Sequence, residues 1–319
     1  MPNAAPEPLL GRFREDIGAL IGAGHSEKPV FAVAVSGGPD SMALLWLATH
    51  AFPGQVAAAT VDHGLRPEAR AEAEMVADWC AQAGVPHMIL SPAEPIVGSI
   101  QAAARAVRYD LLHRWREAQG GDWLLTAHHA DDQLETLLMR LNRSSGVGGL
   151  AGIRARNGAV LRPLLGWRRA ELAEIVAVQR LPHAHDPSNR DERYDRVAMR
   201  NRLADVDWID PLATARSAAA CADAEDAIGW VIDRMMAEHV HKGEGETLRL
   251  DRHDFPREIQ RRLLTRMIAS LDPDAASPRG EALDQALVQL FRGKKAMIGR
   301  WLLSGGEVWT VCPAPPRSR

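Results

Sequence analysis

Two glycines, two hydroxyl groups and one carboxylate stand together in the run Ser36-Gly37-Gly38-Pro39-Asp40-Ser41. Glycine residues let backbone N–H groups approach a ligand without a side chain in the way. A helical pattern of apolar residues starts within the same run, and the N-terminus of a helix attracts anions. The run therefore predicts a phosphate-binding loop, with Asp40 as a ligand for a hard cation such as Mg2+. The alternative is an ordinary strand-to-helix turn, because Gly-Gly and Pro-Asp are common turn formers.

This loop differs from two well-known nucleotide-binding loops. No Gly-Lys-Ser/Thr run follows it, so it lacks the lysine with which a Walker A motif reaches the terminal phosphates. Its glycines also lack the spacing of a Rossmann loop. The residues therefore favour a nucleotide site of another type.

A second group of candidate functional residues occupies the run His128-His129-Ala130-Asp131-Asp132-Gln133-Leu134-Glu135-Thr136. Glu135 lies four residues after Asp131 and three after Asp132, so a helix would bring these carboxylates to one side. Acidic residues at a helix N-terminus are also mildly stabilising, and simple capping is the alternative interpretation. Two histidines and three carboxylates exceed what capping requires. We therefore expect the run to hold the Mg2+ of a nucleotide or to bind the ammonium group of an amine.

Two further features are weaker. The run His183-Ala184-His185-Asp186-Pro187-Ser188-Asn189, followed by Tyr194 and Arg200-Asn201-Arg202, contains side chains that ligate metals but also ordinary turn residues. Between Glu135 and Glu171 the chain has seven arginines and no acidic residue. Such a segment suits a surface that meets a polyanion, and equally a solvated face without a partner.

The composition is ordinary for a soluble protein, with 46% hydrophobic residues, 25% charged residues and a net charge of −3. A length of 319 residues allows two domains. We expect no membrane association, because the chain shows neither a signal pattern nor an apolar run of membrane length. Its three cysteines are Cys80, Cys221 and Cys312. Their wide spacing argues against disulfides, structural zinc and sulfur relay, and it indicates a cytoplasmic location.

The pattern of apolar residues predicts the elements that position these groups. Strands are expected at 30–35, 56–61, 86–90 and 122–127, with an edge strand at 159–165. Helices are expected at 9–23, 39–50, 67–83, 99–119, 130–142 and 168–179. The glycine-rich residues 142–158 are expected to form a mobile loop over the site rather than a packed helix. The alternation of strands and helices predicts an α/β fold with a mostly parallel, doubly wound sheet.

In an open parallel sheet, ligands bind at the carboxyl ends of the strands. The loop at 36–41 follows the first predicted strand, Asp62 and His63 follow the second, and His128 follows the fourth. We therefore expect these residues to share one nucleotide site. The helix at 99–119 would place Arg105 and Arg108 on one face.

The character of the chain changes near Ala213. We expect residues 1–212 to form a nucleotide-binding domain that contains the candidate site and residues 213–319 a smaller, mostly helical domain. The second domain would contain a long alanine-rich helix, helices at 256–270 and 281–291, and a hairpin at 298–311 that is interrupted by Gly305-Gly306.

Taken in order, these motifs resemble those of the tRNA(Ile)-lysidine synthase family, within the PP-loop or N-type ATP pyrophosphatase superfamily. The matching runs are Ser36–Ser41, Val61–Arg66, Ala104–Tyr109, His128–Thr136, Arg162–Leu165 and Asp186–Asn189 with Arg200-Asn201. The order and spacing of several motifs over residues 30–203 is far more specific than any single one. The C-terminal part resembles the family only in general character, and it is shorter than in family members with an additional C-terminal domain.

The resemblance implies an ATP-dependent ligation with Mg2+. ATP would adenylate the oxygen on carbon 2 of the wobble cytidine in the CAU anticodon of an isoleucine tRNA. The side-chain amine of free L-lysine would then displace AMP and give lysidine, which pairs with adenosine and changes the amino-acid identity from Met to Ile. The C-terminal domain would assist tRNA binding, and homodimer formation stays open.

The expected catalytic residues are Asp40, Asp132, Glu135, Arg105 and Arg200. The loop at 36–41 would hold the pyrophosphate, and the two aspartates would manage Mg2+ or the lysine ammonium. Glu135 would orient or deprotonate the amine. The two arginines would neutralise phosphate charge as it develops. The loop at 142–158 would cradle the unstacked cytidine.

Two alternatives remain. Another PP-loop enzyme would be a thiolase, which needs cysteines for sulfur transfer, or an amide-forming ATP pyrophosphatase, for which no N-terminal nucleophile or glutaminase domain is evident. A non-catalytic ATP sensor would need the loop but has no evident use for the carboxylates between Asp131 and Glu135.

Overall fold

The computed structural model describes residues 6–22, 28–64, 68–93, 100–184, 195–203, 206–278 and 280–315. It divides into two compact units, Met1–Ala222 and Asp223–Arg319, with the boundary inside helix α9 (Pro211–His239). Residues 65–67 and 185–194, which include parts of two predicted motifs and Tyr194, lie outside the described ranges. Within those ranges, no helix has both the length and the apolar character needed to cross a membrane.

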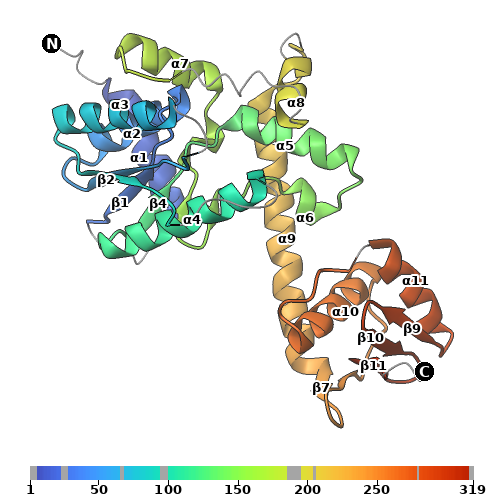
Figure 1. Ribbon diagram of the computed structural model, residues 1–319. Helices are drawn as coiled ribbons and strands as arrows, with labels where there is room; N and C mark the ends of the chain where they lie inside the picture. Colours follow the sequence, from blue (N-terminus) through green and yellow to red (C-terminus); the bar gives the residue numbers. More distant parts are fainter. Residues whose placement is uncertain are drawn as a thin grey trace. The chain divides into compact units, whose positions relative to one another are not determined.

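The first unit is built on a six-stranded sheet with the strand order β3-β2-β1-β4-β6-β5 (Figure 1). Its strands are β1 (Phe31–Ala34), β2 (Val56–Val61), β3 (His87–Leu90), β4 (Trp123–Leu125), β5 (Arg156–Asn157) and β6 (Val160–Leu161). All neighbouring pairs are parallel except β5 and β6, which are antiparallel. The predicted α/β fold with a mostly parallel sheet is confirmed.

Helices cover both faces of this sheet (Figure 1). The described helices of this unit before α9 are α1 (Glu7–Ile21), α2 (Pro39–Ala51), α3 (Glu68–Ala83), α4 (Ile100–Ala118), α5 (Ala130–Asn142), α6 (Val147–Leu150), the 3-10 helix η1 (Pro163–Gly166), α7 (Arg169–Val178) and α8 (Asp195–Leu203). Val33 packs with α1, α2 and α7, whereas its neighbour Ala32 packs with Leu112 and Trp115 of α4. Successive strand residues point to opposite faces, so these two clusters form the two halves of the core.

Helix α2 is the most deeply buried helix of the site region. Every residue from Ser41 to Ala48 is buried, which leaves this helix without a solvated face. A helix that is apolar on all sides belongs in a core between other elements. The loop at its N-terminus is therefore fixed by the packing of the whole unit.

The predicted edge strand at 159–165 is wrong in its position within the sheet. Strand β6 pairs with β4 on one side and with β5 on the other, so β5 forms the edge. The chain reverses between β5 and β6 at Gly158, whose φ of +57° suits glycine. Two-residue strands are too short for an apolar period to reveal them.

Residues 142–158 also differ from the predicted loop, because they contain the helical turn α6. Gln133 of α5 is buried and anchors this segment. Its Nε2 donates to Ile153 O (3.1 Å), and its Oε1 accepts from Ile153 N (2.7 Å). Gly152 has φ +60°, and a Cβ there would lie 2.5 Å from Gln133 Oε1. The segment is thus attached to α5 by a clamp that requires glycine at position 152.

Replacing Gln133 by Ala should lower the free energy of unfolding by about 1–3 kcal/mol, because a backbone donor and acceptor lose their partner. Amide hydrogen exchange at residues 147–153 should become faster, since local opening no longer breaks these bonds. Gln133→Glu keeps the acceptor oxygen and should give an intermediate result. Unchanged exchange in the alanine variant would contradict the clamp.

The second unit contains a five-stranded antiparallel sheet with the order β7-β8-β11-β10-β9. Its elements after α9 are β7 (Val240–Lys242), β8 (Leu248–Leu250), α10 (Arg257–Leu271), α11 (Gly280–Phe291), β9 (Lys295–Ile298), β10 (Trp301–Ser304) and β11 (Trp309–Pro313). The predicted hairpin is present as β10 and β11, whereas β7, β8 and β9 escaped sequence analysis because they are only three or four residues long. A Cβ at Gly305 would lie 2.1 Å from Leu290 O, so the hairpin turn approaches α11 closely.

Candidate functional site

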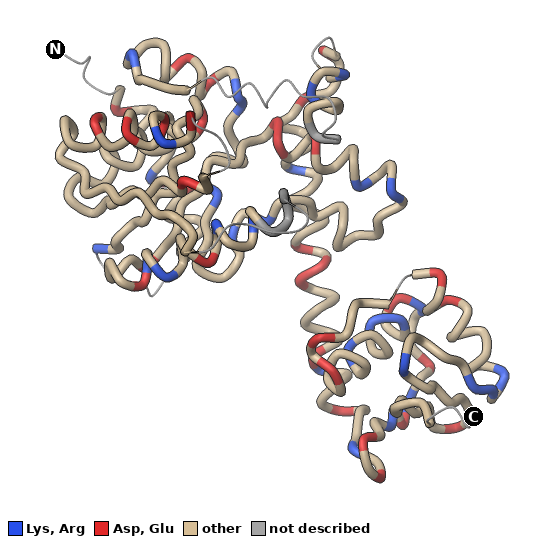
Figure 2. Tube along the Cα trace, viewed as in Figure 1, with Lys and Arg blue, Asp and Glu red and all other residues tan. Residues whose placement is uncertain are grey.

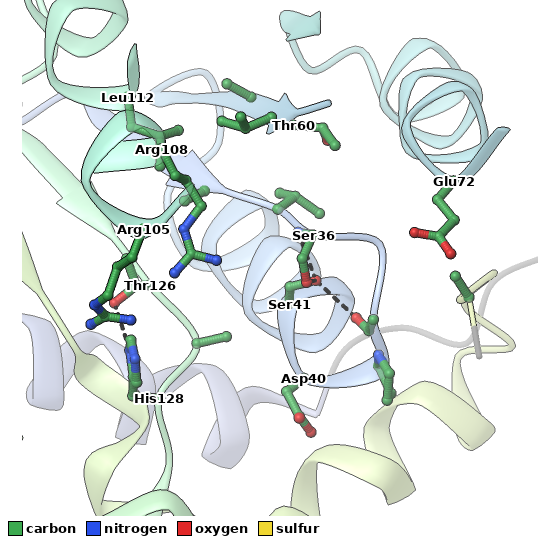
Figure 3. Close-up of a pocket in the computed structure, with 18 of the residues that line it drawn as sticks. Ser36, Asp40, Ser41, Thr60, Glu72, Arg105, Arg108, Leu112, Thr126 and His128 are labelled. Atoms are coloured by element: carbon green, nitrogen blue, oxygen red, sulfur yellow. Dashed lines mark hydrogen bonds between the residues drawn. The ribbon is translucent and has the colours of Figure 1, made fainter. Parts of the chain in front are cut away.

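The Ser36–Ser41 loop connects β1 to α2 and is closed by its own hydroxyl groups (Figure 3). Ser41 Oγ donates to Gly38 O (2.8 Å) and accepts from Ser36 N and Ser36 Oγ, both at 3.2 Å. Gly37 has φ +82°, a backbone conformation that favours glycine. Gly38 is the N-cap of α2 and has no side chain with which to cap it, so the N–H groups of the first turn are open to an anion.

A cavity of about 600 Å3 opens beside this loop. It lies at the carboxyl ends of β1, β2 and β4, where the strand order reverses direction. Open α/β sheets bind their ligands at this kind of switch point. The polar side chains of the lining are Ser36, Asp40, Ser41, Thr60, His63, Glu72, Arg105, Arg108, Tyr109, Thr126, His128, Asp132, Arg169 and Arg200.

One wall of the cavity carries a pair of arginines. Figure 3 shows Arg105 and Arg108 of α4 reaching inward, with Glu72 of α3 on the far side of the loop. The guanidinium carbons of Arg105 and Arg108 lie 5.1 and 5.6 Å from the centre of the Tyr109 ring. Burial lowers the pKa of Arg108. The charge of Tyr109 acts to raise this pKa, and the charge of Arg105 acts to lower it. Two neighbouring cations repel each other until an anion joins them, so this wall favours a phosphate group.

His63 lies at the same wall, at the end of β2. Burial lowers the pKa of its imidazole, the charge of Arg108 lowers it further, and Asp62 acts in the opposite direction. The ring is therefore neutral at pH 7 and can both donate and accept a hydrogen bond.

A second group of charged residues in the site surrounds His129, which is 1% exposed. Its Nε2 lies 3.5 Å from Asp40 Oδ2 and 3.6 Å from Asp132 Oδ2, and its Nδ1 lies 3.6 Å from Asp131 Oδ2. Burial alone would lower the pKa of His129, but hydrogen bonds to Asp131 and Asp40 and the charge of Asp132 outweigh it and raise the pKa to about 9. His129 is therefore a buried cation at neutral pH.

His129 is also the N-cap of α5. Its backbone N–H donates to Asp132 Oδ2 (3.1 Å), while Asp132 N lies 3.4 Å from His129 Nδ1. When the ring is protonated, Nδ1 carries a hydrogen and faces Asp131, so the cap depends on the shorter bond to Asp132. Burial would raise the pKa of Asp131, but the bonds from His129 and from the Arg169 backbone N–H (2.8 Å) lower it.

Arg200 of α8 completes the charged group. Its Nε donates to Glu135 Oε1 (2.7 Å), its Nη2 donates to Glu135 Oε2 (3.4 Å), and the same Nη2 lies 3.7 Å from Asp132 Oδ1. Burial would lower the pKa of Arg200, but the bond to Glu135 and the charges of the acids raise it. The guanidinium thus bridges a buried glutamate and an aspartate that lines the cavity.

Most of the predicted site residues lie around this one cavity, and three do not line it. Gly37 forms the tight turn within the Ser36–Ser41 loop. Asp62 Oδ1 accepts from Gly64 N (2.9 Å) in the turn after β2. Glu135 is only 3% exposed and lies behind Arg200. Residues 136–170, which begin inside α5, contain seven arginines and no acidic residue (Figure 2).

Sequence reasoning missed several residues of the site. Thr60 and Glu72 were not singled out at all, whereas His129, Arg108 and Arg169 belonged to predicted runs but were given no individual role in the site. The spacing of Arg108 from Arg105 contained a signal, as did the place of His129 directly before a predicted helix. Glu72 and Arg169 carried none, because only the packing of α3 and α7 brings them to the cavity.

In metal-free protein, His129 should cause the free energy of unfolding to decrease as the pH rises from 6.5 to about 9. A folded-state pKa above the ordinary 6.5 means that folding takes up a proton, so the stabilisation is complete below pH 6.5 and is lost as the pH rises through about 9. The expected difference is about 3 kcal/mol. His129→Asn keeps a good N-cap residue and should remove this part of the pH dependence. The free energy of unfolding can be measured by urea unfolding at each pH. An equal decrease with pH in both proteins would contradict the assignment of this pH dependence to His129.

Comparison with known proteins agrees with this geometry. The family model for the PP-loop domain matches residues 10–206. The tRNA(Ile)-lysidine synthase of Zymomonas mobilis is 43% identical and covers 98% of this chain and 96% of its own length. The enzyme of the same name from Novosphingobium aromaticivorans is 41% identical over 90% of this chain and 88% of its own length.

A solved structure shows the same fold at low identity. The U34-tRNA thiolase of Methanococcus maripaludis, a protein with a [4Fe-4S] cluster, superposes with a TM-score of 0.51 at 16% identity over 70% of this chain and 81% of its own. This likeness concerns the fold alone, whereas the relatives above are similar along nearly the whole chain. The chain therefore belongs to the tRNA(Ile)-lysidine synthase family, a family of PP-loop ligases.

Proposed function

We propose that this protein joins free L-lysine to carbon 2 of the wobble cytidine in the CAU anticodon of tRNA(Ile), with ATP as the activating co-substrate. The observation that carries this proposal is one cavity whose lining contains two chemically different groups. The open N-terminus of α2 and the two arginines of α4 suit phosphates. The carboxylates of Asp40, in the first turn of the same helix α2, and of Asp132 suit a cation or an ammonium group. The names of the relatives agree with such a reaction.

In the first step, the oxygen on carbon 2 of cytidine attacks the α-phosphorus of ATP, and pyrophosphate leaves with the electron pair of the broken P–O bond. The Ser36–Ser41 loop and the N-terminus of α2 would hold the leaving pyrophosphate. Arg105 and Arg108 would stabilise the charge that develops on the phosphate oxygens.

In the second step, the side-chain nitrogen of lysine attacks carbon 2, and the bond from this carbon to the adenylated oxygen breaks to release AMP. The ammonium form must first lose a proton, because it has no free electron pair. Asp132 is better placed than Glu135 to meet this group, since Asp132 lines the cavity and Glu135 lies behind Arg200. We therefore propose Asp132 as the contact of the amine and Glu135 as the residue that holds Arg200 in place.

The residues also fit a Mg2+ ion that accompanies ATP. Asp40 and Asp132 both approach His129 Nε2 within 3.6 Å, so their carboxylates lie close together. Within the described ranges, no group of three or more His, Cys, Asp or Glu side chains is arranged to bind a metal ion by itself. Mg2+ rarely needs one, because it binds through one or two carboxylates together with phosphates and water. Bound there, it would offset phosphate charge.

Sulfur transfer finds less support in this chain. Cys80 is buried in α3, and burial raises the pKa of its thiol to about 12. A thiol with such a pKa is a poor nucleophile at neutral pH. Among the described residues that line the cavity, none is a cysteine.

The proposed reaction can be tested with labelled lysine, ATP and a tRNA(Ile) that carries CAU, with each component omitted in turn. Lysine should enter the RNA only when all three are present, and AMP should form in equal amount. AMP formation with a different acceptor would contradict the proposed substrate. No AMP under any of these conditions would contradict ligation and favour an ATP sensor.

Glu135→Gln should retain ATP binding but reduce lysidine formation strongly, by about 100-fold or more, as expected when a charged partner in an active site is lost. The physical reason is that a neutral amide holds Arg200 less firmly than a carboxylate does. Single-turnover assays and ATP titration measure the two effects separately. Near-normal turnover would remove Glu135 from the mechanism.

A further inference from the structure

Trp208 lies in the link between α8 and α9 with its indole ring in solvent. Its exposed fraction is 82%, the largest among the exposed large hydrophobic side chains of the described residues. Tryptophan is normally buried to a large degree, because its ring carries much apolar surface. An indole held outside the core is a strong contact residue for a partner, and its surroundings indicate which partner that is.

The C-terminal side of this link is tied to the rim of the cavity. Asp210 caps α9 by accepting from Leu212 N (3.0 Å), and the same oxygen accepts from Arg168 Nη2 (2.5 Å). The next residue after Arg168 is Arg169, which is exposed and lines the cavity. Trp208 therefore stands two residues from an anchor that is joined directly to the cavity rim.

The N-terminal side of the link leads to the same place. Val206 N donates to Leu203 O (3.1 Å), and Leu203 is the last residue of α8. Helix α8 packs against α5 and carries Arg200 into the cavity. The indole is thus held between two segments that both contribute side chains to the catalytic cavity.

The sequence around this link carries charges of both signs. The link itself contains Asp205, Asp207 and Asp210, and the arginines of the neighbouring segments are Arg168, Arg169, Arg202 and Arg216. Asp210 is already neutralised, because it pairs with Arg168 and lies 3.9 Å from a second guanidinium. An exposed aromatic ring is a stacking platform for the bases of single-stranded nucleic acid, and exposed arginines such as Arg169 and Arg202 suit its phosphates.

Resting on the proposed function, we propose that Trp208 stacks on an unpaired base of the RNA loop that carries the target cytidine. A cytidine that enters the cavity must leave its stack, and its neighbour then loses one stacking partner. The indole of Trp208 replaces that partner and holds the loop open. Trp208 is a binding and positioning residue in this scheme, and it takes no part in bond formation.

The test compares the full chain with Trp208→Ala, Trp208→Phe and the control Trp230→Ala, which removes another exposed tryptophan (63% exposed). The probes are an anticodon stem-loop RNA with CAU and a duplex of the same stem without the loop. Trp208→Ala should bind the stem-loop about 10- to 100-fold more weakly, as for the loss of one stacked base. Trp208→Phe should stay within about threefold of the wild type because it keeps an aromatic face.

The duplex separates stacking from a general structural effect. Binding of the duplex, binding of ATP and the melting temperature should be unchanged in Trp208→Ala, and Trp230→Ala should behave as the wild type with both RNAs. Wild-type affinity of Trp208→Ala for the stem-loop, or equal weakening toward stem-loop and duplex, would overturn the stacking role. If the wild type binds the stem-loop but forms no lysidine, the proposed function fails while the stacking result still stands by itself.

Discussion

The charge cluster around His129 is the interaction on which the site depends. A cation buried at this depth is stable only with anionic partners, and here Asp40 comes from the N-terminus of α2 while Asp131 and Asp132 come from that of α5. The imidazolium therefore joins the Ser36–Ser41 loop to the helix that carries the acids. Both helices begin at carboxyl ends of parallel strands, β1 and β4, that are direct neighbours in the sheet.

The cavity lining contains both cationic and anionic side chains, and these come from different elements. The wall of Arg105 and Arg108 is positively charged, whereas the carboxylates of Asp40 and Asp132 lie beside His129, and that of Asp132 lies also beside Arg200. In the proposed reaction, the arginines would attract the phosphates of ATP and the carboxylates would attract the amine of lysine. Glu135 does not line the cavity, and its ion pair joins it to Arg200, which does.

Much of the fold could be predicted from the sequence, because long elements carry clear patterns. Helix α5 and strand β2 have the predicted bounds, and the hairpin of β10 and β11 was visible in the chain. The strands of two to four residues were not, since so few residues cannot display a period. The helical turn α6 was missed for another reason: Gln133, distant in sequence, fixes a glycine-rich segment that local propensity assigns to a loop.

For this protein, the sequence by itself determined the family, the order of the elements and the residue types of the phosphate loop and acid run, because each depends on neighbours along the chain. Only the tertiary structure decided which acid faces the cavity, that His129 rather than His128 is the buried cation, and that Arg200 belongs to Glu135. Burial and the distance between charges arise when remote segments pack together, and these two quantities set both pKa and ion pairing.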